Sequence, residues 1–429
     1  MLDPPPVSLR LAIALLALAL ALPGTAAAQT LIQEDDVLEH LRFLQEVADA
    51  NGNRGEGFGG DVVTEDYIAQ KLEAAGWTVT RTRVDFPWPV LHAPPIVGRV
   101  GERAIMPLAY SGAGSFVARV RTLRGRGGCR RGDFRGLRGR IALSLTGACP
   151  YRRIALNAQR AKARAILIAS GDRGIPAYGT LLGPGVTIPA VLVNDPAARR
   201  LARSRRRIRI LLNTTIEFPQ AGQNIVAELP GTEGSGVVMA GGHLDSVPVG
   251  PGINDNGSGI AALLEIAERL AAGPRPRQTL RLGFWPAEEL YLFGSRAYVD
   301  GLSPEERRRI TAYVNLDMIG SPNGVPELYA GDGRIEQALR RFVPNAGRTP
   351  VEGASDHLPF LAAGIPVGGI YTGGPELVTR RQARRWGAQA GKPRDPCYHR
   401  LCDDLDNVSP QLTARMANVT LGALTRLAG

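Results

Sequence analysis

The sequence has 429 residues, which exceeds one ordinary hydrophobic core and suits two domains of roughly 100–200 residues each. Hydrophobic residues make up 44% and charged residues 21%, a composition that excludes an intrinsically disordered chain. The formal net charge of +11 is spread unevenly, because residues 101–216 hold 23 Lys and Arg against 4 Asp and Glu, so the rest of the chain is acidic.

The first 28 residues have the pattern of a secretory signal peptide. Arg10 precedes an apolar run, residues 11–22, that is shorter than the roughly 20 residues a membrane-spanning helix needs. A turn and a small-residue cleavage site follow: Pro23, Gly24, Ala26, Ala27 and Ala28. We expect cleavage before Gln29, with an uncleaved anchor as the alternative. No later stretch is apolar for long enough to cross a membrane, so the sequence predicts a secreted protein, periplasmic or extracellular, in which disulfides are allowed.

The segment after the expected cleavage site predicts two helices and a strand. Apolar residues recur at helical spacing over residues 33–50 and 64–75, and Gly76 follows as a typical helix end. Residues 77–86 alternate between apolar and polar side chains as a half-buried strand does.

The basic segment, residues 101–216, is rich in Gly and Arg and differs in composition from the rest of the chain. Short apolar runs predict three strands, and one periodic run predicts a helix: 141–145, 165–169 and 190–193 for the strands, and 154–163 for the helix. The composition changes again near Phe218. We therefore predict that residues 29–100 and 217–429 form one discontinuous domain, which the basic segment interrupts as an inserted β-rich domain.

Strands and helices alternate in the second part of the discontinuous domain. The predicted elements are a strand at 236–240, a helix at 258–271, and strands at 279–285 and 311–316. Such alternation predicts an α/β domain with a largely parallel central sheet. Because active sites in open α/β sheets lie beyond the carboxyl ends of strands, the site is expected there.

Residues of metal-ligand type follow each of these strands or precede the helix. They are His243 and Asp245, Asp255, Glu288 and Glu289, Asp317, and, near the end of the chain, His399. Each one alone has an ordinary structural explanation. Several carboxylates in one cleft would repel each other by several kcal/mol unless cations neutralise them. Two His and three carboxylates suit two zinc ions that share a bridging carboxylate and leave a position for water.

Four cysteines permit three disulfide pairings. Sequence proximity favours Cys129 with Cys149 and Cys397 with Cys402. A zinc site built from cysteines is the alternative, but the CxxC spacings that such a site needs are missing from the sequence.

Seven motifs surround the candidate ligands in a fixed order: GGHLDS from Gly241, GINDNGSG from Gly252, PAEEL from Pro286, NLDMIGSP from Asn315, SDHLPF from Ser355, PVGGIYTG from Pro366 and CYH from Cys397. This set resembles the secreted di-zinc aminopeptidases of the Streptomyces leucine-aminopeptidase type, with weaker similarity over residues 33–86. Separately, GRIAL, GACPY and NAQRAKARAILI, which lie within residues 139–168, resemble a protease-associated domain. Many relatives carry that domain as an insert at this place.

The resemblance implies a three-layer α/β zinc-exopeptidase fold, with a mixed, mostly parallel central sheet flanked by helices, and an inserted protease-associated domain. It implies a metallo-aminopeptidase that removes N-terminal, apolar residues from peptides with a metal-activated water and two zinc ions (Zn2+). His243 and Asp317 would bind one zinc, His399 and Glu289 the other, and Asp255 would bridge them.

The same resemblance assigns the remaining roles. Glu288 would be the general base, and Tyr398 would donate a hydrogen bond to the developing oxyanion. Asp245 is expected to fix the imidazole of His243. The peptide bond between Asp255 and Asn256 is expected to be cis.

The sequence departs from the Streptomyces-type pattern at Ala354, where those enzymes have an Arg, so a cation that helps to hold substrate is missing. Asp356 and His357 are expected to support this loop. The basic insert contains no histidine. We expect it to control access and attract anionic surfaces without supplying catalysis. It lacks a nucleic-acid recognition motif, so a nucleic-acid partner is not expected.

Three other functions stay open. A glutaminyl-cyclase-like acyltransferase of the same fold needs one zinc, which the five candidate ligands argue against. A carboxypeptidase acting on acidic peptides would need a basic pocket for the C-terminal carboxylate. The absence of an Arg at position 354 argues against this alternative. A non-catalytic binding module would have no use for Glu288 or an intact ligand set.

Overall fold

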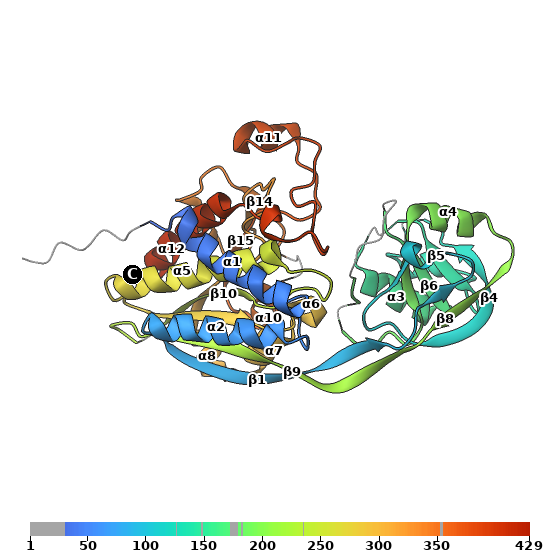
Figure 1. Ribbon diagram of the computed structural model, residues 1–429, viewed down its shortest axis with the longest axis horizontal. Helices are drawn as coiled ribbons and strands as arrows, with labels where there is room; N and C mark the ends of the chain where they lie inside the picture. The colour runs from blue at the N-terminus through green and yellow to red at the C-terminus, as the bar shows by residue number, and fades with distance from the viewer. Residues whose placement is uncertain are drawn as a thin grey trace, which may run out of the picture.

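A computed structural model gives the arrangement of the chain (Figure 1). It describes residues 31–125, 127–146, 149–171, 179–181, 183–234, 236–351 and 355–429. The expected signal peptide and Ala354 lie outside these ranges. Figure 1 shows two units, each with its own sheet, joined by a ribbon made of strands β1 and β9.

The larger unit is built on an eight-stranded sheet with the order β1-β9-β11-β10-β12-β15-β13-β14. Its strands are β1 Thr78–Leu91, β9 Thr214–Leu229, β10 Val237–His243, β11 Thr279–Trp285, β12 Ile310–Leu316, β13 Glu327–Tyr329, β14 Gly347–Thr349 and β15 Val367–Tyr371. β10 pairs in parallel with β11 and β12, and β12 with β15, whereas the β1–β9, β9–β11 and β13–β15 pairs are antiparallel. The sheet is therefore mixed with a parallel centre, as the sequence predicts.

Helices cover both faces of this sheet. One face packs against α1 Glu34–Asn51, α2 Gly60–Ala74, α5 Ser258–Ala272, α9 Gly333–Arg340 and α12 Pro410–Ala428. The other face packs against α7 Phe293–Gly301 and α10 His357–Ala362. Alternation along β10 explains the two cores, because Val238 and Ala240 belong to the first and Val237 and Met239 to the second. The result is the three-layer α/β arrangement that the resemblance implies.

The smaller unit is the inserted one, and its seven-stranded sheet has the order β2-β8-β4-β5-β6-β7-β3. The strands are β2 Ile96–Val97, β3 Ile105–Pro107, β4 Gly114–Thr122, β5 Ile141–Ser144, β6 Ala165–Ala169, β7 Ala190–Val193 and β8 Arg207–Leu212. α3 (Tyr151–Arg160) packs in one core of this unit and α4 (Asp195–Arg203) in another. The predicted helix at 154–163 is thus present, three residues earlier than expected.

Strand β1 continues past residue 86, where the sequence pattern ends it. A register shift between Phe86 and Trp88 breaks the alternation, and the strand then runs on to Leu91 opposite Thr214 of β9. β9, which the sequence did not reveal, brings the chain back from the insert along the full length of this ribbon.

The predicted disulfides and the predicted cis peptide bond are present in the structure. Both favoured disulfides are present, Cys129–Cys149 and Cys397–Cys402, and the Asp255–Asn256 peptide bond is cis. Within the described ranges, no helix combines the length and the apolar character needed to cross a membrane.

Candidate metal centre

Three adjacent parallel strands deliver candidate ligands to one edge of the sheet. His243 is the last residue of β10, and Asp317 directly follows β12. α6 (Glu288–Tyr291) begins shortly after β11, whose last residue, Trp285, pairs with His243. Because parallel strands end at the same edge, these side chains meet although they are far apart in sequence.

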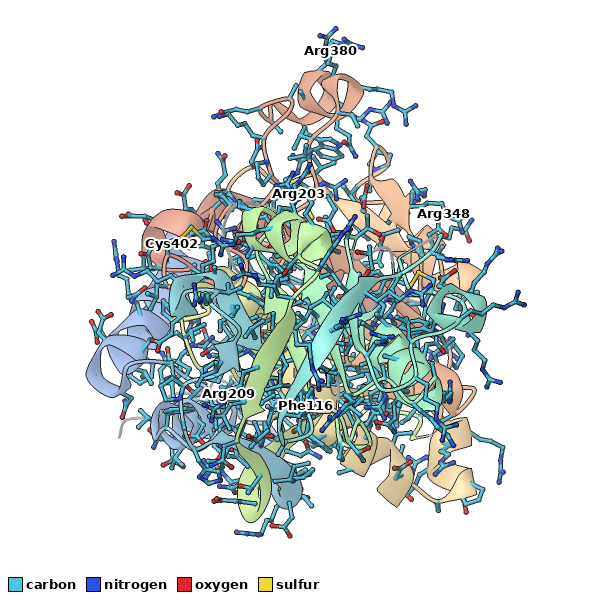
Figure 2. All side chains as sticks on the ribbon, turned by 90° about the vertical axis from the view of Figure 1, so that its right-hand side faces the viewer. Phe116, Arg203, Arg209, Arg348, Arg380 and Cys402 are labelled. Carbon is cyan, nitrogen blue, oxygen red and sulfur yellow. A yellow bond between two sulfur atoms is a disulfide. The ribbon has the colours of Figure 1, made fainter. Side chains whose placement is uncertain are left out.

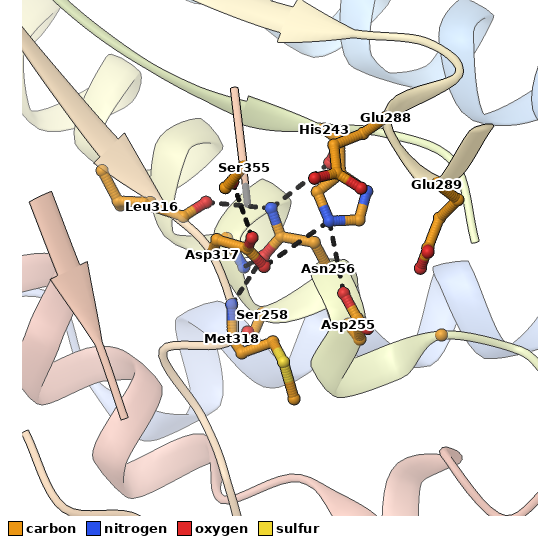
Figure 3. A network of polar contacts seen from close by, with 12 residues as sticks. His243, Asp255, Asn256, Ser258, Glu288, Glu289, Leu316, Asp317, Met318 and Ser355 are labelled. Carbon is orange, nitrogen blue, oxygen red and sulfur yellow. Dashed lines mark hydrogen bonds and ion pairs between the residues drawn. The ribbon is translucent and has the colours of Figure 1, made fainter. Parts of the chain in front are cut away.

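Two groups of ligand atoms form there and share Asp255. In the first group, His243 Nε2 lies 3.2 Å from Asp255 Oδ1 and 3.5 Å from Asp317 Oδ1 (Figure 3). His399 Nε2 lies 3.3 Å from Asp255 Oδ2 and 3.1 Å from Glu289 Oε2. Each group thus contains one imidazole, one carboxylate of its own and one oxygen of Asp255. The structure therefore brings together all five residues that the sequence selected as ligands.

The donor set suits metal ions. The ligand atoms within each group all lie within 4.8 Å of one another. Among the described residues, Glu289 Oε1 is buried without a hydrogen-bond donor, and the imidazoles of the two groups are the polar neighbours of Asp255 Oδ2 (3.3 Å) and Asp317 Oδ1 (3.5 Å). A buried anionic oxygen without a partner is costly, and zinc accepts mixed imidazole and carboxylate ligands.

Electrostatics support the same conclusion. Burial raises the pKa of Glu289 to about 7, although His399 lowers it, and burial raises the pKa of Glu288 well above the usual carboxyl range. Burial alone would lower the pKa of His399, but Glu289 and Asp255 together raise it to about 10. Without cations, the carboxylates and imidazoles of the cluster thus bind protons that such groups usually lack at neutral pH. Bound cations would supply the positive charge instead and would lower these pKa values.

A sharp turn of the backbone precedes the two adjacent glutamates. Ala287, just before α6, has a left-handed backbone with φ 54°, and Figure 3 shows the two carboxylates pointing apart. Glu289 joins His399 and Asp255, whereas Glu288 is outside both ligand groups. The turn starts α6 at this edge of the sheet, and consecutive helical positions point in different directions, so one glutamate can bind metal while the other stays available to react.

Asp245 holds this turn. Its carboxylate accepts hydrogen bonds from the backbone N–H groups of Glu288 (3.1 Å) and Glu289 (3.3 Å). The nearest partner of His243 Nδ1 is the backbone carbonyl of Asp245 at 3.0 Å, while the carboxylate lies 3.5 Å away. Asp245 thus contacts the imidazole, as expected, and does so mainly through its backbone carbonyl, because the carboxylate is engaged with α6.

Tyr398 lies beside the second ligand group. Its ring stacks on His399 with centroids 3.8 Å apart. Burial raises the pKa of the Tyr398 phenol well above its usual value, and Asp255 and Glu289 raise it further, so the hydroxyl keeps its proton and can donate a hydrogen bond. His357 contacts Val351 O at 2.7 Å through Nε2, which fits a role in supporting its loop.

The sequence analysis did not identify the residues that hold the ligands in place by hydrogen bonds. Ser355 Oγ donates to Asp317 Oδ2 at 2.7 Å, and the Asp403 carboxylate accepts from the backbone N–H of Asp255 at 3.1 Å. Arg54, fully buried, donates to three carbonyls of the loops around Asp255: Leu244, Pro251 and Gly252. Ser355 belongs to the SDHLPF motif, which was a usable signal; Arg54 and Asp403 carry no local signature.

Comparisons with known proteins agree with this geometry. The family model for peptidase family M28 matches residues 224–424, and that for the PA domain matches residues 112–201. Leupeptin-inactivating enzyme 1 of Streptomyces exfoliatus is 44% identical over 222 residues, a match that spans 50% of this chain and only about half, 51%, of that relative. The probable lipoprotein aminopeptidase LpqL of Mycobacterium tuberculosis is 33% identical over 411 residues, which cover 88% of this chain and 81% of LpqL. The structure of BSAP, a zinc aminopeptidase from Bacillus subtilis, aligns with a TM-score of 0.72 at 25% identity, covering 92% of this chain and 95% of that one.

Proposed function

The chain belongs to peptidase family M28 and carries an inserted PA domain, and from this premise we propose that it is a secreted aminopeptidase that uses two zinc ions to remove apolar N-terminal residues from peptides. The observation that carries the proposal is the pair of ligand groups that share Asp255. A single shared carboxylate with one imidazole on each side suits two ions held close together.

His243, Asp317 and one oxygen of Asp255 would hold the first ion, and His399, Glu289 and the other oxygen of Asp255 the second. Zinc bound there supplies an acidified water, whose pKa can fall to about 7, and polarises the carbonyl of the substrate.

Glu288 is the proposed general base. It precedes a ligand in sequence, lies outside both ligand groups and is half-buried, so it can reach a water at the centre without binding a metal itself. In this role it accepts a proton from the attacking water and delivers it to the amine that leaves. Tyr398 donates its hydroxyl proton in a hydrogen bond to the oxyanion that forms on the substrate carbonyl.

Metal removal tests the proposal. We expect dialysis against a chelator to abolish hydrolysis of leucine p-nitroanilide and added zinc to restore it. The matched control substrate is N-acetyl-leucine p-nitroanilide, which lacks the free amine and should not be cleaved. Full activity in protein shown to be free of metal would refute the proposal.

Two further substrates separate the competing functions. On a peptide with N-terminal glutamine, a glutaminyl cyclase would join the α-amine to the side-chain amide carbon and release ammonia, while the residue stays on the peptide. On a peptide with a blocked N-terminus and a free C-terminal carboxylate, a carboxypeptidase would release the last residue. A panel with Leu, Phe, Lys and Glu at the N-terminus tests the apolar preference, since an enzyme with that preference turns over the first two fastest.

Secretion and the domain division are part of the proposal. Two disulfides fit an oxidising compartment, and the N-terminal pattern over residues 1–28 fits a cleaved signal peptide. Two separate sheets support division into a peptidase domain and an insert, for which we propose residues 29–100 with 217–429 and residues 101–216. Strand β2 (Ile96–Val97) pairs in the sheet of the insert, which favours a boundary a few residues before Gly101. Mass measurement of the protein recovered from the outside of the producing cell would locate the new N-terminus, which we expect at Gln29.

A basic face of the insert is proposed to contact anionic surfaces. Exposed arginines line α4 and the paired strands β4 and β8, among them Arg203 and Arg209 (Figure 2). Arg119 of β4 lies opposite Arg207 of β8. We expect Arg206→Ala/Arg209→Ala to elute from immobilised heparin at lower salt than the unchanged protein. The control Arg380→Ala/Arg381→Ala removes two exposed arginines from α11 (Arg380–Trp386) of the other domain. Equal shifts in both variants would contradict a binding role for the insert.

A further inference from the structure

The short helix α6 has two sides. Its first residues, Glu288 and Glu289, face the metal centre, while Leu290 is 3% exposed and packs in a hydrophobic core that β1 and the insert share. Ala287, which precedes the helix, belongs to the same core. That core also contains residues of α3, β5, β6 and β7, all from the insert: Ala142, Ile154, Ala155, Ala158, Ile166, Ile168, Ala190 and Leu192. The insert therefore packs directly against the turn that carries the proposed general base.

Tyr291, the last residue of α6, is held from the insert side as well. The guanidinium of Arg152, from the insert, lies 5.6 Å from the centroid of its ring, while that of Arg296, from α7 of the peptidase domain, lies 4.1 Å from it. A Cβ on Gly183 would come within 2.7 Å of the ring, which shows how closely the insert backbone approaches. Thr180 Oγ1 also lies 3.4 Å from the carbonyl oxygen of Leu290.

Arg152 is itself fixed in place. It extends from α3 and donates hydrogen bonds to the carbonyls of Leu181 (3.2 Å), Gly183 (2.7 Å) and Pro184 (2.9 Å). These bonds tie the helix of the insert to the loop that touches Tyr291. A fixed guanidinium on one side of an aromatic ring is a rigid support for the element that bears the ring.

The backbone of α6 needs such support. Ala287 and Leu292, on either side of the helix, both have left-handed backbones with φ 54° and 56°, although neither is glycine. Such conformations persist only where surrounding contacts enforce them. From the peptidase side, Asp245 accepts hydrogen bonds from Glu288 and Glu289; from the insert side, the contacts reach Leu290 and Tyr291.

We propose that the insert sets the position of the general base, with Arg152 and Tyr291 acting as positioning residues for Glu288. This inference rests on the proposed role of Glu288 in an aminopeptidase. It goes beyond the expectation from sequence, in which the insert controls access and contributes nothing to catalysis. Replacing residues 101–216 with a short linker should accordingly lower the turnover number even for a small substrate, whose access to the site the insert would not limit.

Point variants test the proposal in the full chain. Arg152→Ala removes the guanidinium that supports Tyr291, and we expect the turnover number (kcat) for leucine p-nitroanilide to fall about tenfold or more, since displacement by about 1 Å can cost 10²-fold. KM should change less than twofold, because the substrate contacts are not altered. Zinc content should fall by less than kcat does, because Glu289, which α6 also carries, is one of three ligand residues in its group, whereas Glu288 alone is the base. Arg152→Lys, which keeps the charge, should recover part of the loss, and Tyr291→Phe, which keeps the ring, should stay near the unchanged protein.

Arg164→Ala is the matched control. Arg164 is also an insert arginine over an aromatic ring, 4.1 Å from the centroid of Phe116, but that pair belongs to the insert alone. We expect this variant to keep its kcat. The proposal is overturned if Arg152→Ala keeps the kcat of the unchanged protein, if Arg164→Ala loses as much, or if the loss merely follows the fraction of unfolded protein in thermal denaturation. Failure of the proposed function would look different, because the unchanged protein would then be inactive or insensitive to chelator.

Discussion

Exchange of Glu288 for Gln separates catalysis from metal binding. The substitution keeps the size of the side chain and the backbone N–H that donates to Asp245 at 3.1 Å. It removes only the ability to accept a proton. General-base catalysis contributes about 10²- to 10⁴-fold, so we expect kcat to fall at least about 10²-fold, equivalent to roughly 2.7 kcal/mol of barrier. Zinc content, measured by inductively coupled plasma mass spectrometry, should stay unchanged because Glu288 is outside both ligand groups.

The neighbouring substitution Glu289→Gln is the matched comparison. Glu289 Oε2 lies 3.1 Å from His399 Nε2, and its other oxygen, Oε1, is buried without a hydrogen-bond donor in the described part of the chain. Loss of this negative charge should reduce occupancy of one metal site, with activity falling in proportion. The reasoning is refuted if Glu288→Gln empties a site while activity per bound metal persists, because the two glutamates would then have exchanged roles.

Three further outcomes are expected. Asp255→Asn should weaken both metal sites together, since one oxygen of Asp255 serves each group. Titration with zinc should then show weaker binding at two sites, whereas a substitution of a ligand that belongs to one group should weaken binding at one site. Asp245→Asn should lower kcat about tenfold with little loss of zinc, because His243 is held by the backbone carbonyl at position 245, whereas α6 loses a charged acceptor; loss of metal instead would contradict this division. Burial raises the pKa of Glu65 to about 7, although hydrogen bonds from Gln223 lower it, so the folded state binds this proton more tightly than the unfolded chain does. The free energy of unfolding should therefore decline, by up to about 3 kcal/mol, as the pH rises from about 4.5 to 7. In urea titrations Glu65→Gln should flatten that decline, the exposed Glu73→Gln should not, and equal slopes in both variants would disprove the assignment.

Much of the catalytic domain could be predicted because its signals are local. The strands β10, β11 and β12 are short apolar runs, and each is followed by residues with an evident chemical use, such as His243 and Asp317. The rule that parallel strands end at one edge then brings those residues together without any knowledge of distances. Proximity in sequence was likewise enough to favour both disulfides.

Contacts between distant segments could not be predicted in the same way. Arg54 resembles any surface arginine in the sequence, yet it is fully buried and bonds three loop carbonyls. Leu290 ends the PAEEL motif and Tyr291 follows it without any signal of their own, and only the folded chain shows that the insert packs on them. β9 escaped detection because a long strand that leaves one sheet and enters a ribbon has no single pattern of burial.

The central claim is that two metal ions share Asp255. X-ray diffraction from crystals of the zinc-loaded protein, recorded on both sides of the zinc absorption edge, tests it most directly. The account predicts two anomalous peaks per chain, one beside His243 and Asp317, the other beside His399 and Glu289, with Asp255 contacting both. A single peak, or two peaks of which one lies away from Asp255, would contradict it.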